Sequence, residues 1–182
     1  MYWAGKGNPL VQGSGQVWWF GDRGGRTTGM VGNVKEKLAS RFPYPNTIIL
    51  HVGTNDIFYY NTFTIRQRIL VTLLGIRQLL PYTRIIWSDV LPRIFYYGEE
   101  NAGSGRRIAN FINAQAHKYI RSMTNAAYIN HNAVLPTSHF GLFRIDGLHL
   151  SEEGLIVLRM SWAEALIYFN SHKLAVAFPP GY

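Results

Sequence analysis

Short apolar runs alternate along this chain with longer segments in which apolar residues recur every three or four positions. Runs of strand-forming residues predict four strands, over 16–20, 47–52, 84–90 and 127–130. Helical spacing of apolar residues predicts four helices, over 29–42, 64–80, 106–123 and from Ser151 to about 169. Because strands and helices alternate, we expect an α/β domain with a parallel sheet and helices on both of its faces.

The chain has 182 residues and 47% hydrophobic content, which fits one domain with a core of its own. We place this domain at 16–170. Residues 1–15 are rich in glycine and are expected to be an irregular segment, and 171–182 are expected to form a loose tail because of Pro179 and Pro180.

Composition excludes several classes of protein. The absence of cysteine excludes disulfides and thiolate metal sites, and no apolar window reaches the ~18 residues of a membrane span. The first residues lack the basic-then-apolar order of a signal peptide, which favours an intracellular location. No cofactor is expected, and the oligomeric state is left open.

The formal net charge of +8 could favour an acidic partner such as nucleic acid. The basic residues are nevertheless spread over three predicted helices, and no nucleic-acid-binding motif accompanies them. This pattern is typical of solvated outer faces, and nucleic-acid binding remains an alternative. The groups concerned are Lys35/Lys37/Arg41, Arg66/Arg68 and Arg106/Arg107.

Polar residues with possible chemistry follow the predicted strands. Gly25 comes after the first run, Asn55 after the second, and Asp146 and His149 lie just before the last helix. In an open α/β sheet, ligands bind at the carboxyl ends of the strands, so these loops are where a site is expected. An ordinary turn would also explain Asn-Asp beside glycine, and a lone histidine at a helix entrance is often structural.

The residue types suit ester or amide hydrolysis. An Asp and a His three positions apart, Asp146 and His149, could supply a general base and the group that orients it. The Gly25 N–H and the Asn55 amide are neutral donors, as an oxyanion hole requires.

The motifs resemble those of the SGNH hydrolases, also called GDSL-type esterases. Gly24-Gly25-Arg26-Thr27-Thr28 is similar to the second block of that family, Gly53-Thr54-Asn55-Asp56 to the third, and Asp146-Gly147-Leu148-His149 to the fifth. The resemblance implies a flavodoxin-like three-layer α/β/α fold and a small ester as substrate. It implies His149 as general base, Asp146 as its partner, and Gly25 and Asn55 as oxyanion donors. The phrases 88–93 and 143–151 are also similar to retroelement-associated SGNH-like domains.

The block that carries the family's nucleophilic serine has no counterpart. It should lie one strand-helix unit before Gly25. The 30 residues from Gly25 to Asn55 give the length of one such unit, so the block would lie ahead of residue 1. Gly21-Asp22-Arg23 and Ser14 are too close to Gly25 for that. We therefore expect that the chain begins just after the serine, that the sheet lacks its first strand, and that the domain is inactive and poorly stable. The alternative is a non-catalytic binding module, of retroelement origin, for nucleic acid or another acidic partner.

Overall fold

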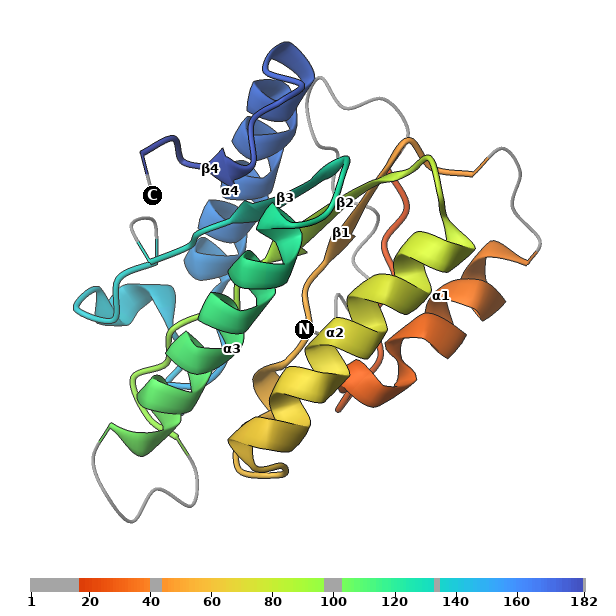
Figure 1. The fold of residues 1–182 in the computed structure, drawn as a ribbon. Helices are drawn as coiled ribbons and strands as arrows, with labels where there is room; N and C mark the ends of the chain where they lie inside the picture. Colours follow the sequence, from red (N-terminus) through yellow and green to blue (C-terminus); the bar gives the residue numbers. More distant parts are fainter. Residues whose placement is uncertain (1–16, 40–43, 97–102, 133–134, 182) are drawn as a thin grey trace.

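A single parallel sheet forms the centre of the protein. The structure, a computed structural model, describes residues 17–39, 44–96, 103–132 and 135–181 (Figure 1). The strands of its four-stranded sheet follow one another in chain order, and all neighbours are parallel. They are β1 (Thr47–Leu50), β2 (Arg84–Ser88), β3 (Ala126–Ile129) and β4 (Ala177–Phe178).

Helices cover both faces of this sheet. The helices α1 (Met30–Leu38), α2 (Thr62–Leu79) and α3 (Ser104–Arg121) lie on one face, and α4 (Glu152–Ser171) lies on the other (Figure 1). The side chains of β2 alternate accordingly, since Ile85 and Trp87 join the core under α1–α3, whereas Ile86 joins the core under α4. The expected three-layer α/β/α fold is therefore confirmed.

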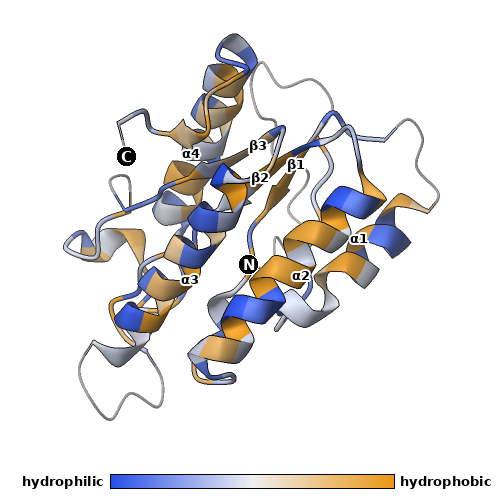
Figure 2. Ribbon diagram, viewed as in Figure 1, coloured by the Kyte–Doolittle hydropathy of each residue, from blue (hydrophilic) through white to orange (hydrophobic). Residues whose placement is uncertain are grey.

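The sequence explains where two of the helices begin. The Asn61 side chain accepts a hydrogen bond from the Thr64 N–H at 2.8 Å and caps α2, and Ser151 caps α4 through the Gly154 N–H at 3.1 Å. Hydrophobic residues run along the strands and alternate with hydrophilic ones around the helices (Figure 2). Among the described residues, no helix is long and apolar enough to cross a membrane.

Two predicted elements were wrong. Residues 17–20 form no strand; Trp19 instead packs on Trp162 of α4, with ring centroids 5.4 Å apart. Within the described residues, β1 therefore has β2 as its only neighbour, and Ile48 and Ile49 remain partly exposed. The tail was expected to be loose, but its residues 177–178 form β4, which pairs with β3 at Tyr128 and Ile129.

The start of α4 fits closely under the preceding loop, which yields a stability prediction. A Cβ on Gly154 would fall on the backbone carbonyl of Leu142, and backbone cannot rotate away as a side chain can. We expect Gly154→Ala to destabilise the fold by ~2 kcal/mol or more. Gly32→Ala, in open space on α1, should stabilise it by ~0.5–1 kcal/mol. Urea unfolding midpoints measure both, and a Gly154→Ala midpoint at or above that of the unmodified protein would contradict the prediction.

Candidate active site

Two loops that are 30 residues apart in sequence lie side by side. Gly53, with φ of 116°, turns the chain out of β1 into the 3-10 helix Thr54–Asp56. The Asp56 carboxyl group is 1% exposed and accepts two hydrogen bonds from Thr27, one from its N–H at 3.1 Å and one from its hydroxyl at 2.8 Å. A buried carboxyl group requires such partners, so this contact fixes the two loops together.

Asn55 and Gly25 meet in this contact, although not in the way an oxyanion hole uses them. The Asn55 Nδ2 donates to the Gly25 carbonyl oxygen at 3.0 Å, which leaves its second N–H for another acceptor. The Gly25 N–H closes a turn by donating to the Asp22 carbonyl oxygen at 3.0 Å. For Gly25 to act as an oxyanion donor, this turn would have to exchange that bond for one to the substrate.

Asp146 and His149 form a compact pair. Gly147, with φ of 61°, folds the turn so that Asp146 Oδ2 lies 2.7 Å from His149 Nδ1. The other oxygen, Oδ1, accepts the backbone N–H groups of Leu148 at 2.9 Å and His149 at 3.0 Å. The hydrogen bond from the His149 ring, followed by these backbone bonds, holds the Asp146 pKa well below its usual range.

This pair leaves the outer nitrogen of the imidazole accessible. When Nδ1 donates its proton to Asp146, Nε2 carries the lone pair, and the His149 side chain is 68% exposed. No serine in the described part of the chain makes a hydrogen bond with His149. The geometry is thus that of an oriented general base that faces solvent.

The topology sets both pairs at the carboxyl edge of the sheet. Asn55 lies in the loop after β1, and α4 starts at the same edge because it runs back to the beginning of the parallel strand β4. The loop after β2 contacts the Asp146–His149 turn, since the N–H groups of Ile94 and Phe95 donate to the Gly147 carbonyl oxygen at 2.9 and 3.3 Å. The four residues therefore fall into two contacting pairs at one edge, and their catalytic roles stay a prediction.

A buried polar network beneath this edge was not predicted. Ser88, at the end of β2, lies 3.0 Å from His51 Nδ1 and 2.8 Å from His131 Nε2, and it accepts the Trp162 indole N–H at 2.9 Å. His131 also lies 3.3 Å from the Ser161 hydroxyl through Nδ1. Burial lowers the pKa of His51 to about 4 and that of His131 to about 3. Both imidazoles, the buried His131 and the half-buried His51, are consequently neutral at neutral pH.

A second Asp-His pair lies on the α3 face of the sheet. Asp89 Oδ1 is 2.7 Å from His117 Nε2, and the His117 ring stacks on Tyr128 with centroids 3.6 Å apart. Burial raises the Asp89 pKa, against the effect of the His117 hydrogen bond. Asp89 is 2% exposed, so this pair binds β2 to α3 and has little access to a substrate.

The described residues include no cluster of three or more histidine and acidic side chains that could hold a metal ion. The site consists of a polar edge with one exposed imidazole.

Several solved structures superpose on this chain, two carbohydrate esterases among them. A protein from Streptococcus pneumonia that is provisionally assigned as a platelet activating factor superposes with a TM-score of 0.61 at 21% identity, over 79% of this chain and 69% of that chain. A carbohydrate esterase of family 3 from Talaromyces cellulolyticus superposes with a TM-score of 0.61 at 16% identity, over 82% of this chain and 70% of that chain. The family 3 carbohydrate esterase of Clostridium thermocellum has a TM-score of 0.61 at 15% identity, over 82% of this chain and 69% of that chain.

The fold is an esterase-like one. At these identities the likeness extends to the fold alone, which agrees with the flavodoxin-like architecture that the SGNH resemblance implied. No protein-family model matches the sequence, and no curated protein matches it either.

Proposed function

We propose that this chain is a carboxylic ester hydrolase domain of the SGNH type in which His149 is the general base. The observation that carries the proposal is the 2.7 Å contact between Asp146 and the inner nitrogen of an exposed imidazole, at the sheet edge that also holds Asn55. Three motifs in the order of that family and an esterase-like fold support it.

The proposed chemistry uses neutral donors and one base. His149 Nε2 accepts the proton of an attacking hydroxyl group while a bond forms between that oxygen and the ester carbonyl carbon. Asp146 keeps the imidazole oriented and stabilises its protonated form. The free N–H of Asn55, joined by the Gly25 N–H once it leaves Asp22, donates to the negative carbonyl oxygen. The bond from the carbonyl carbon to the alcohol oxygen then breaks, and the imidazolium returns its proton to the departing alcohol. Where the attacking group is a serine, water releases the acid from the acyl-enzyme by the same route.

The attacking hydroxyl group is the open part of this proposal. No serine among the described residues bonds to His149; with the described residues alone the attacking group would be water, and hydrolysis would be slow. The same observation favours the second candidate, a binding module that retains the site without catalysis.

A comparison of four proteins tests the proposal. We expect a longer form, with a Gly-Asp-Ser-bearing strand ahead of residue 1, to hydrolyse p-nitrophenyl acetate faster than residues 1–182, because it supplies the attacking serine. His149→Ala in the longer form should lose ~100-fold or more of that rate. His172→Ala, an exposed histidine that ends α4, controls for hydrolysis by surface imidazole and should keep it.

Equal rates for the longer form and its His149→Ala variant would overturn the catalytic role. Failure of the longer form to exceed residues 1–182, with both folded, would favour the binding module.

A further inference from the structure

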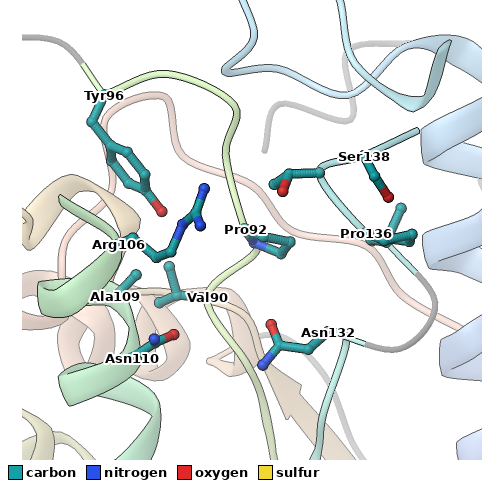
Figure 3. Close-up of a pocket in the computed structure, with 11 residues that line it drawn as sticks. Val90, Pro92, Tyr96, Arg106, Ala109, Asn110, Asn132, Pro136 and Ser138 are labelled. Atoms are coloured by element: carbon teal, nitrogen blue, oxygen red, sulfur yellow. The ribbon is translucent and has the colours of Figure 1, made fainter. Parts of the chain in front are cut away.

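A pocket of about 350 Å³ opens beside the candidate active site. Three segments line it: the loop after β2, the first turns of α3 and the loop after β3 (Figure 3). Val90, Ala109 and Leu135 give it an apolar floor. Its polar lining comes from Tyr96, Arg106, Asn110, Asn132, Thr137 and Ser138. A mixed lining of this kind is typical of a site for a small hydrophilic molecule.

The described residues that line this pocket carry charge of one sign. Arg106 is the charged residue among them; the others are neutral, and none is acidic. The Arg106 side chain is exposed and extends from α3 toward the space that the lining residues enclose (Figure 3). The first turn of α3 also contains no acidic residue, so the positive end of the helix dipole adds to the charge of the two arginines there. A negatively charged ligand would offset both effects.

The loop after β2 joins this pocket to the candidate active site. The Val90 side chain packs against Gly53, so that a Cβ on Gly53 would lie 3.1 Å from it. The rings of Tyr96 and Phe58 meet edge to face, with their centroids 6.4 Å apart. Farther along, Ile94 and Phe95 hold the turn that carries His149. The loop after β2, which forms one wall of the pocket, therefore contacts both the loop that carries Asn55 and the turn that carries His149.

We infer that the pocket binds a carboxylate on the ester substrate, so that the enzyme would prefer esters that carry one negative charge away from the reacting bond. This rests on the proposed function for the ester itself. The planar guanidinium of Arg106 suits a carboxylate, and the Asn and hydroxyl groups can donate to its remaining lone pairs. With a single cation in its lining, the pocket matches a monoanion better than a doubly charged phosphate.

Binding can be measured without catalysis by NMR titration of the full chain. The probes are monomethyl succinate, which carries one ester and one carboxylate, dimethyl succinate, which is neutral, and inorganic phosphate. We expect monomethyl succinate to bind at least ~10-fold more tightly than either other probe, because dimethyl succinate offers no charge to Arg106 and phosphate offers a second charge that this one guanidinium leaves unpaired. Its shifts should centre on 106–110, 132 and 135–138.

The neighbouring arginine provides a matched control. Arg106→Gln should reduce the affinity for monomethyl succinate by ~10-fold, whereas Arg107→Gln removes the same charge one residue away, outside the pocket lining, and should leave it within ~2-fold. An equal loss of affinity in both variants would indicate a general effect of charge, and would contradict binding in the pocket. No loss of affinity in either variant would contradict it as well. Tighter binding of phosphate than of monomethyl succinate would contradict the inference that the pocket binds a carboxylate.

The failure of this inference is distinguishable from failure of the proposed function. Selective binding of monomethyl succinate without hydrolysis, in a form that carries the serine, would keep the pocket and overturn the hydrolase. Hydrolysis of the charged and neutral esters with the same kcat/KM, unchanged in Arg106→Gln, would keep the hydrolase and overturn the pocket.

Discussion

Replacing Asp56 by alanine is expected to destabilise the protein by about 3 kcal/mol. The substitution removes both acceptors for Thr27 in a place where water does not reach, since Asp56 and Thr27 are 1% and 2% exposed. The Thr27 N–H and hydroxyl would be left without partners, and each buried unsatisfied donor costs ~1–3 kcal/mol. Glu36→Ala, which removes an exposed carboxyl group on α1, should change stability by less than ~0.5 kcal/mol.

The effect should extend to the candidate site, because the Asp56 contact is what brings Asn55 to Gly25. Thr27→Val removes only the hydroxyl and should cost less than Asp56→Ala, and the double variant should cost less than the two changes added together. Urea unfolding of the four proteins measures this coupling. Equal midpoints for Asp56→Ala and Glu36→Ala would show that the buried carboxyl group does not hold the loops together.

The sequence predicts the sheet well where short apolar runs lead into polar loops. The runs that became β1, β2 and β3 are mostly apolar, with β-branched or aromatic residues in each, which is typical of buried parallel strands. The run at 16–20 has the same composition, but strand propensity depends on a neighbour to pair with, and Trp19 finds its burial against Trp162 instead. Two residues are too few for periodicity, so β4 could not be predicted.

Local spacing was sufficient for the Asp146–His149 contact, because a turn of four residues brings an Asp and a His at that separation together. The contact between Asn55 and Gly25 could be predicted only together with the parallel sheet, which brings loops that are far apart in the sequence to one edge. Sequence could not show that the Gly25 N–H is already used within its own turn, since that bond depends on the backbone conformation of Arg23 and Gly24. The Ser88 network was missed because its members are scattered over 51–162, and only the packing of α4 on the sheet assembles them.

That network leads to the second prediction: stability should fall as the pH is lowered from 7 to 5. The pKa of His51 is about 4 and that of His131 about 3 in the folded protein, against 6.5 for an unperturbed histidine. Below pH 6.5 the unfolded chain therefore binds protons that the folded chain does not, and unfolding becomes more favourable. At pH 5 this amounts to ~2 kcal/mol for each residue, and the loss grows until the pH reaches the folded pKa values.

Burial is the main cause of these low folded pKa values, and the neutral rings fit the hydrogen bonds around Ser88. The Ser88 oxygen has two lone pairs and one proton. It can accept from Trp162 and from His51 while it donates to His131, which in turn donates to Ser161. Protonation of either ring would place a charge where burial disfavours it, and this cost is what lowers the folded pKa values.

Urea unfolding at pH 7 and pH 5 tests this account with two variants. His131→Gln should be less stable than the unmodified protein at pH 7, since it disrupts the network, but should lose ~2 kcal/mol less between the two pH values. His172→Gln, an exposed histidine, should keep the full pH dependence. Asp89 opposes the trend, because its raised pKa lets the folded protein bind a proton earlier, so the comparison between variants is more informative than the slope of one protein. If His131→Gln and the unmodified protein lose the same stability from pH 7 to pH 5, His131 does not titrate as the buried network requires.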